Sequence, residues 1–321
     1  MYDPGIERVS DNCISLHRNE NLFVDQLFLR NLIFHAIEDA PLNMYPDSSS
    51  STLREAIGKY QNCSPENIYV GNGADGVLAD LLSYFRDEHD EVGLQPLTYQ
   101  VYPYLCKKYN YKQKSINETE QIWILDSPNS INGKIFNFSS IKNHPKILIW
   151  DNVYGEFTSK DSKPILEKEN TIRVHSFSKF FALASLRVGY CIADTKVISK
   201  LLERKDIFNV NTLAQKTAVL ALQNEEYFNS LKSQMLEAKE KLTHGLIDLG
   251  FSISPGEANF IWATHENINM KLLQEELAKA EILVRRFHGA HLENYLRITI
   301  PPIQVVNKLL IVSENILSNF S

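Results

Sequence analysis

The feature that most constrains the fold is a set of short runs in the middle of the chain that are apolar at almost every position. These runs alternate with helical patterns and occupy Ile122–Leu125, Lys146–Trp150 and Val188–Ile192. A strand that is apolar throughout is covered on both faces, which is typical of a parallel or mixed sheet flanked by helices. The pattern therefore predicts an α/β fold with a mostly parallel sheet, whose ligands lie at the carboxyl ends of the strands.

The last third of the chain has a different pattern. Apolar positions recur at helical spacing from about Thr212 to Leu249, a stretch so long that we expect a break near Asn224. After Pro255 we expect, in order, a strand, a helix, two strands and an amphipathic helix: Asn259–Trp262, Ile268–Ala280, Ile282–Phe287, Leu296–Ile300 and Ile303–Leu317. This order predicts a small α+β domain at the C-terminus.

Composition excludes several classes of function. The 321 residues are 44% hydrophobic, enough for one large core and a smaller one. A net charge of -6 argues against a nucleic-acid partner. The sequence has neither a run of about 18 apolar residues nor a secretion signal, so we expect a cytoplasmic protein without a membrane partner. Its four cysteines lack the spacing of a metal site, and we expect reduced thiols and no metal: Cys13, Cys63, Cys106 and Cys191.

A glycine-rich turn, Gly71–Gly76, directly follows the strand-like Ile68–Val70 and opens an apolar helical face at Val77. A turn of this kind presents free backbone N–H groups and the positive end of a helix dipole, which suits a phosphate. The alternative is an ordinary turn between a strand and a helix.

An acidic residue, Asp151, ends one of the apolar runs, and Tyr154 follows three positions later. A carboxylate at the carboxyl end of a strand caps the next segment or faces a ligand crevice. In the second case it can pair with a protonated heterocyclic nitrogen, and Tyr154 can reach the same ring from the following turn.

Lys179 lies between a strand-like run and a long apolar stretch. Apolar surroundings lower the pKa of a lysine, as amine chemistry with a carbonyl requires. The hydroxyls of Ser176 and Ser178 flank it, and Arg187 follows eight residues later. Hydroxyls and a guanidinium are good ligands for a phosphate dianion. The alternative is a solvated surface lysine.

Ser178, Lys179 and Arg187 resemble the Ser-Lys-x8-Arg segment of fold-type-I pyridoxal-phosphate aminotransferases, and Leu186–Tyr190 is most similar to histidinol-phosphate aminotransferases. Further segments fall in the same order along nearly the whole chain: Leu16–Asn21, Tyr45–Asp47, Gly71–Gly76, Thr98–Tyr102, Asp151–Tyr154, Asn209–Asn211, Ala258–Phe260, Ile282–Arg285 and Leu296–Thr299. The resemblance implies a seven-stranded type of sheet in a large cofactor-binding domain over residues 31–225. It also implies a small domain over 226–321 and an N-terminal arm over 1–30 that packs with the small domain.

The resemblance implies that pyridoxal 5'-phosphate is bound to Lys179 as a Schiff base. Lys179 then moves the Cα proton, Asp151 keeps the pyridine nitrogen protonated, and Tyr154 hydrogen-bonds the ring hydroxyl. The other residues that it implies for cofactor binding are Gly73, Ala74, Asp75, Tyr99, Asn129, Ser130, Ser176, Ser178 and Arg187.

For the substrate, the resemblance implies that Arg297 binds a carboxylate or phosphate, with Arg285 and Asn21 nearby. Tyr45 would reach across the interface of a homodimer into the neighbour's site. The expected reaction transfers an amino group between L-glutamate or 2-oxoglutarate and a small phosphorylated ketone or amine. The alternatives are decarboxylation of a phosphorylated amino acid, as in threonine-phosphate decarboxylase, and a protein of this fold that only binds the cofactor.

The sequence departs from the family pattern around the substrate. Ser127–Gly133 replaces the usual Asn-Pro-Thr-Gly turn, whose asparagine touches the ring hydroxyl. The strict equivalent of this asparagine is Ser130, and the cofactor contact is made by Ser130 or by its neighbours Asn129 or Asn132. Gly76 stands where a glutamate is usual, Pro301-Pro302 replace Gly-Thr, and the stretch from Tyr102 to Pro128 is short. These changes leave the identity of the amino acceptor open.

Overall fold

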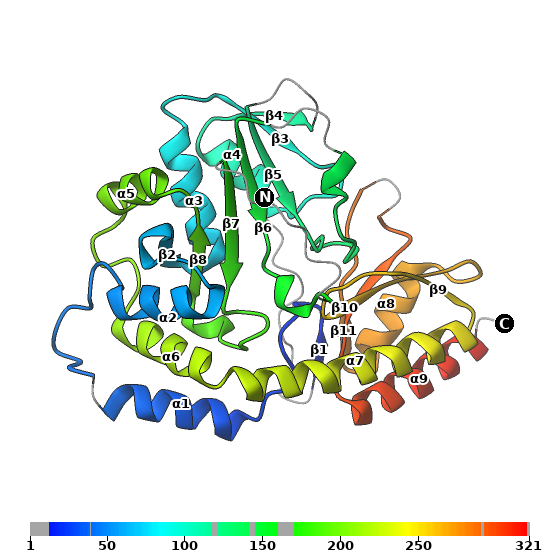
Figure 1. Ribbon diagram of the computed structural model, residues 1–321. Helices are drawn as coiled ribbons and strands as arrows, with labels where there is room; N and C mark the ends of the chain where they lie inside the picture. The colour runs from blue at the N-terminus through cyan, green and yellow to red at the C-terminus, as the bar shows by residue number, and fades with distance from the viewer. Residues whose placement is uncertain are drawn as a thin grey trace.

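The apolar runs of the sequence lie side by side as strands of one mixed sheet (Figure 1). The computed structural model describes residues 13–38, 40–116, 121–140, 145–159, 170–289 and 292–319. Over these ranges the sheet has seven strands in the order β2-β8-β7-β6-β5-β3-β4. Their bounds are Ile68–Asn72 for β2, Glu91–Leu94 for β3, Lys112–Ser115 for β4, Ile122–Asp126 for β5, Ile147–Asp151 for β6, Thr171–Ser176 for β7 and Val188–Ile192 for β8. Strands β4, β3, β5, β6 and β7 pair in parallel, whereas β8 is antiparallel to β7 and β2. The mostly parallel sheet is therefore confirmed.

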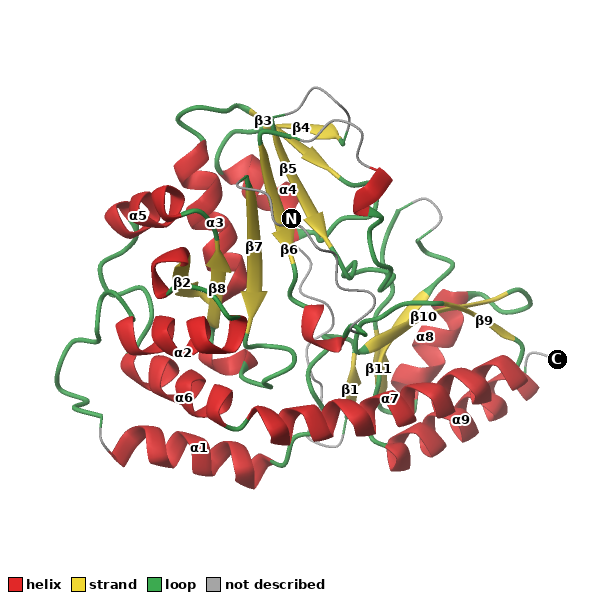
Figure 2. Ribbon diagram, viewed as in Figure 1, coloured by secondary structure: helices red, strands yellow, loops and turns green. Residues whose placement is uncertain are grey.

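Helices cover both faces of this sheet (Figure 2). Successive residues of a strand point to opposite faces, and here both sets are buried. Ile172 and Val174 of β7 pack in the same apolar cluster as α3, α4 and α5, whereas Val188 and Tyr190 of β8 pack with α2 and α6. The bounds of these helices are Ser51–Gln61 for α2, Gly73–Phe85 for α3, Val101–Lys108 for α4, Thr195–Arg204 for α5 and Thr212–Gln223 for α6.

The C-terminal part forms its own antiparallel sheet in the order β12-β10-β9, which packs against α7, α8 and α9. Its elements are β9 Phe251–Ser254, β10 Phe260–His265, β12 Leu296–Thr299, α7 Glu225–Asp248, α8 Met270–Lys279 and α9 Ile303–Ser318. A further strand near the N-terminus, β1 (Ile14–Leu16), pairs in parallel with β11 (Ile282–Val284). Residues far apart in the sequence therefore meet beside the small sheet.

The long helical stretch is broken where we expected it. Helix α6 ends at Gln223 and α7 begins at Glu225, and the side-chain nitrogen of Asn224 donates to the carbonyl of Leu220 at 2.8 Å. The expected strand over Ile282–Phe287 is shorter, because it ends at Val284 and only Arg285 continues it as a bridge to Arg297.

Helix α1 (Gln26–Glu38) packs against α6, and the sequence patterns predict no helix in this stretch. Residues 1–12 of the expected N-terminal arm lie outside the described residues. Among the helices of the described ranges, none is both long and apolar enough to cross a membrane.

Candidate active site

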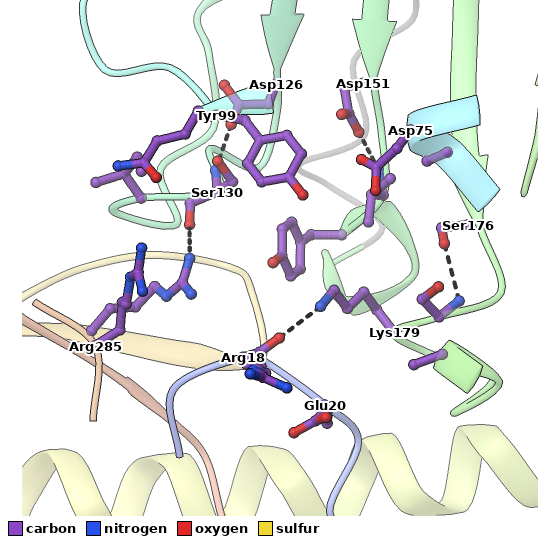
Figure 3. Close-up of a pocket in the computed structure, with 18 of the residues that line it drawn as sticks. Arg18, Glu20, Asp75, Tyr99, Asp126, Ser130, Asp151, Ser176, Lys179 and Arg285 are labelled. Atoms are coloured by element: carbon purple, nitrogen blue, oxygen red, sulfur yellow. Dashed lines mark hydrogen bonds between the residues drawn. The ribbon is translucent and has the colours of Figure 1, made fainter. Parts of the chain in front are cut away.

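The carboxyl ends of β5, β6 and β7 and the start of α3 border a cavity of about 380 Å³, which the small sheet borders on the other side (Figure 3). Most residues that we expected at the site line this cavity. They are Ala74, Asp75, Tyr99, Ser130, Asp151, Tyr154, Ser176, Ser178, Lys179, Arg187, Arg285 and Arg297. The fold thus brings together residues that are more than 200 positions apart in the sequence.

Lys179 reaches into the middle of this cavity (Figure 3). Its Nζ donates to the backbone carbonyl of Arg18 at 2.8 Å and lies 6.0 Å from the ring centroid of Tyr154. Burial, together with the guanidinium of Arg297, lowers the pKa of Lys179 to about 8. A substantial fraction of the amine is therefore neutral near physiological pH and able to react with a carbonyl.

One end of the cavity has the donors of a phosphate site. The hydroxyl of Ser178 is buried and has no hydrogen-bond partner in the described part of the chain, while Ser176 accepts from the backbone N–H of Ser178 at 3.0 Å. The guanidinium of Arg187 is 3.2 Å from the carboxylate of Asp75 in the first turn of α3. A helix N-terminus beside hydroxyls and an arginine binds a phosphate dianion well.

The backbone in this region is arranged around Arg187. Gly73 has a φ of +75°, and a Cβ there would lie 2.7 Å from Nη2 of Arg187. Arg187 itself has a φ of +52°, which is unusual for a residue with a side chain. Such conformations cost free energy and concentrate at functional sites. Gly73 does not line the cavity itself, but the absence of a side chain there leaves room for the guanidinium of Arg187.

Asp151 is the last residue of β6, and it is only 6% exposed. It accepts a hydrogen bond from the hydroxyl of Tyr102 at 2.7 Å and one from the backbone N–H of Val153 at 3.1 Å. Burial raises the pKa of Asp151 to about 7, the hydrogen bond from Tyr102 opposes this rise, and the nearby carboxylate of Asp126 adds to it. A positive charge placed against Asp151 would stabilise its ionised form.

Tyr154 is held by residues that we had not singled out. The side-chain nitrogen of Asn19 donates to the Tyr154 hydroxyl at 2.8 Å, and the hydroxyl of Thr299 donates to Asn19 at 3.1 Å. The sequence signal that could have found these residues is the family resemblance, because the segments that carry it contain Asn19, Tyr102 and Thr299. Other lining residues without a predicted role are His17, Arg18, Glu20, Gln100, Asp126, Ile131, Val153, Ala184 and Phe287.

Two arginines face each other at the end of the cavity that the small sheet borders. Arg285 and Arg297 exchange backbone hydrogen bonds of 3.0 and 2.8 Å, so they are directly opposite on neighbouring antiparallel segments. The guanidinium of Arg297 donates to the carbonyls of Ser130 at 2.7 Å and His17 at 3.0 Å. Like charges on directly opposite residues destabilise a sheet. An anion bound beside them would offset that cost.

Several expected residues do not line the cavity. Asn129 is buried, and its side chain donates to Leu97 and Asp126, so it braces the loop that presents Ser130. Asn21 donates to the carbonyl of Phe180 at 2.9 Å. Tyr45 is 81% exposed and stacks on Phe208 with ring centroids 4.6 Å apart.

These features together define a class of protein. A lysine of lowered pKa, a phosphate cradle with an unpartnered buried hydroxyl at Ser178, and a buried acid at a strand end fit the aldehyde, phosphate and ring nitrogen of pyridoxal phosphate. The chain has the architecture of a fold-type-I pyridoxal-phosphate enzyme.

Comparisons with known proteins identify the family. The family model for aminotransferase class I and II matches residues 112–310. Histidinol-phosphate aminotransferase 1 of Oceanobacillus iheyensis is 31% identical over 96% of this chain and 93% of its own length. The chain therefore belongs to the class I and II aminotransferases, and it is a pyridoxal-phosphate-dependent aminotransferase.

Solved structures show the same fold. Histidinol-phosphate aminotransferase from Sinorhizobium meliloti, in complex with pyridoxal-5'-phosphate, superposes with a TM-score of 0.88 at 19% identity, covering 96% of this chain and 92% of that one. L-threonine-O-3-phosphate decarboxylase from Porphyromonas gingivalis superposes with a TM-score of 0.80 at 18% identity, covering 95% and 99%.

Proposed function

We propose that this aminotransferase moves an amino group between L-glutamate or 2-oxoglutarate and a small phosphorylated ketone or amine, as a histidinol-phosphate aminotransferase does. The observation that carries the proposal is that Lys179 lines the same cavity as the facing Arg285 and Arg297. One pair of guanidiniums can bind the side-chain carboxylate of glutamate in one half-reaction and a phosphate in the other.

The residue roles that we propose combine the family resemblance with the places of the residues around the cavity. Pyridoxal phosphate, when bound, withdraws electrons from the substrate's Cα. Lys179 would hold the cofactor through its Nζ, and the same amine would accept the proton that leaves the substrate's Cα. Asp151 would keep the ring nitrogen protonated, and Tyr154, whose orientation is fixed by Asn19, would donate to the ring hydroxyl. Tyr99 would stack on the ring.

At the other end of the cofactor, the backbone N–H groups of Ala74 and Asp75 and the side chains of Ser176, Ser178 and Arg187 would hold the phosphate dianion. These groups form the phosphate cradle. Gly73 leaves room for Arg187, and Ser130 is our candidate for the loop residue that meets the ring, with Asn129 behind it.

The test is a panel of half-reactions followed by the change in cofactor absorption. The amines are L-glutamate, histidinol phosphate, serine phosphate, threonine phosphate and amino-alcohol phosphates. We expect conversion by glutamate and by one phosphorylated amine without release of CO2. Conversion only by unphosphorylated aromatic or branched amino acids would contradict the proposal. Release of CO2 from threonine phosphate would instead favour the decarboxylase alternative. We include this substrate because the Porphyromonas gingivalis decarboxylase has the same fold.

A pair of arginine variants separates substrate binding from cofactor binding. In Arg297→Gln, KM should rise for both glutamate and the phosphorylated amine while the cofactor stays bound. Arg286→Gln is the matched control, because Arg286 points instead to Gln274 and Glu293 outside the cavity. Equal effects of the two variants would contradict a substrate role for Arg297.

We further propose that the enzyme is a homodimer in which Tyr45 contributes to the neighbour's site, and we keep Asn21 as a candidate substrate residue. Large apolar side chains are exposed along α1, the following loop and the segment before α6: Leu27, Phe34, Ile37, Leu42, Met44, Tyr45, Ile207 and Phe208. Monomers rarely expose so many neighbouring apolar groups, and a twofold dimer is the commonest assembly that covers them.

The dimer proposal is tested by mixing inactive subunits. A Tyr45→Phe subunit combined with a Lys179→Ala subunit should restore about one working site per heterodimer. Leu42→Glu should give monomers in light scattering and little activity. A wild-type monomer with full turnover would refute a shared site.

We also propose the domain division expected from the sequence, with an arm over 1–30, a large domain over 31–225 and a small domain over 226–321. The separate sheet β12-β10-β9 and the pairing of β1 with β11 support it. Limited proteolysis that cuts first at the break between α6 and α7, around Asn224, would agree with this division, and early cutting in the middle of α7 would argue against it.

A further inference from the structure

Asp126 lines the cavity, and the proposed function gives it no role. It is the last residue of β5 and the direct partner of Asp151 across the sheet. Its side chain is 2% exposed. A buried carboxylate beside another carboxylate is costly unless hydrogen bonds or charges compensate it, so its contacts indicate what it is there to hold.

The carboxylate of Asp126 binds the loop that follows it. Its Oδ2 accepts from the backbone N–H of Ser130 at 2.7 Å, and its Oδ1 accepts from the side-chain nitrogen of Asn129 at 2.9 Å. The side-chain nitrogen of Gln95 donates to the same Oδ1. Asp126 thus fixes the segment that stands where the family usually has Asn-Pro-Thr-Gly.

The loop in turn holds an arginine. The carbonyl of Ser130 accepts from Nη1 of Arg297 at 2.7 Å. Figure 3 shows Asp126 above Ser130, with a dashed line between them and a second one leading from Ser130 toward the arginines. A continuous path of hydrogen bonds therefore runs from Asp126, at the end of β5, through Ser130 to the guanidinium of Arg297.

We propose that Asp126 is a positioning residue that clamps Ser130 and, through the Ser130 carbonyl, sets the direction of the Arg297 guanidinium. The inference rests on the proposed function, because it takes Arg297 as the group that binds the substrate's anion. In this way Asp126 holds in place the Ser127–Gly133 loop, whose sequence departs from the family's Asn-Pro-Thr-Gly turn.

The chemistry of the clamp calls for a carboxylate. Both oxygens of an ionised carboxylate accept, which matches the donors on Ser130, Asn129 and Gln95. An asparagine would turn an N–H group toward one of these donors and lose that hydrogen bond. Burial raises the pKa of Asp126 to about 6, and the hydrogen bonds from Ser130 and Asn129 oppose the rise, so the group is mostly ionised at neutral pH.

The experiment compares Asp126→Asn and Asp126→Glu with Asp80→Asn in the full-length holoenzyme. Asp80 is the matched control, because it is a partly buried carboxylate that, like Asp126, accepts a short hydrogen bond (from Tyr69 at 2.6 Å), but it lies outside the cavity. Two quantities are measured besides thermal stability: hydrogen exchange at the Ser130 amide, and the dissociation constant of glutarate, which resembles glutamate but cannot react.

We expect Asp126→Asn to speed exchange at Ser130 and to weaken glutarate binding, each by about tenfold or more, as befits the loss of a hydrogen bond to a charged group. In steady state, KM for glutamate should rise more than kcat falls. Asp126→Glu keeps the charge and should restore part of the glutarate affinity. Asp80→Asn should lower the melting temperature without changing either quantity.

Two results would overturn the inference. One is an Asp126→Asn enzyme that exchanges Ser130 as the wild type does. The other is one that is destabilised like Asp80→Asn but binds glutarate within about twofold of the wild type, which would leave Asp126 a purely structural role. A wild-type enzyme that does not bind glutarate would refute the proposed glutamate site instead, and exchange at Ser130 would still decide whether the clamp exists.

Discussion

The chemistry of Lys179 leads to a pH prediction that needs no substrate. Covalent capture of pyridoxal phosphate by the enzyme without cofactor requires the neutral amine. With a pKa of about 8, roughly a quarter of Lys179 is neutral at about pH 7.5, compared with about one part in a thousand for an unperturbed lysine near 10.4. The fold therefore raises the reactive fraction by roughly two orders of magnitude.

The perturbation that tests this account is Arg297→Gln. Burial is the largest cause of the lowered pKa of Lys179, and the guanidinium of Arg297 is the next. Removing that positive charge stabilises the ammonium form, so the pKa of Lys179 should rise and the rate–pH profile should move to higher pH. At a fixed pH below the midpoint, capture should slow. Arg286→Gln should leave the profile where it is.

The assay is stopped-flow absorbance of cofactor capture between about pH 6 and pH 10, with borohydride reduction and mass spectrometry to identify the modified lysine. The wild-type rate should rise with pH and level off above about pH 8. A wild-type midpoint near 10.4 would refute the claim that the fold activates this lysine. An unmoved midpoint in Arg297→Gln would show that the guanidinium does not act on it.

Three further predictions concern the same cavity. Lys179→Ala should lose the cofactor that borohydride fixes and slow turnover by on the order of 10²–10⁴-fold, and a phosphopyridoxyl group found on another lysine would refute the assignment. Asp151→Asn should retain bound cofactor but lose the charge that keeps the ring nitrogen protonated, so Cα proton transfer measured in single turnovers should slow steeply; unchanged kinetics would exclude this role. Arg18 is exposed at the edge of the cavity, so its charge is screened by solvent. Arg18→Gln should therefore raise KM for the phosphorylated amine by only about two- to fivefold. A larger rise would mean that Arg18 contacts the substrate directly.

Much of this fold could be predicted from local patterns. The buried strands β5, β6 and β8 are apolar at nearly every position, and the break at Asn224 follows from the length of the helical stretch. Strand β4 could not be predicted in this way, because Lys112–Ser115 is an exposed edge strand without an apolar position. Its place depends on pairing with β3 and not on burial.

The site could be predicted where its chemistry is local. Ser176, Ser178 and Lys179 are close in the sequence, and their residue types already suggest an amine beside a phosphate. Asn19 and Tyr154 are 135 positions apart, and nothing near either residue shows that they share a hydrogen bond. Contacts of this kind arise only when β1 and the small sheet are brought against the ends of the large sheet.

Asp126 shows why one half of a pair was found and the other was missed. Asp126 and Asp151 carry the same signal, a carboxylate that ends a buried apolar run, but Tyr154 follows only Asp151 and supports an assignment there. Because β5 and β6 are adjacent and parallel, the two carboxylates end at the same edge of the sheet, and the carboxylate of Asp126 adds to the raised pKa of Asp151. A chain that keeps both carboxylates needs a use for each. In the proposed function Asp151 faces the positive ring nitrogen of the cofactor, whereas Asp126 is compensated by the loop donors that it holds. The unusual Ser127–Gly133 sequence and the acid before it therefore form one unit, and a variant that restores the family's Asn-Pro-Thr-Gly turn should lose its dependence on Asp126.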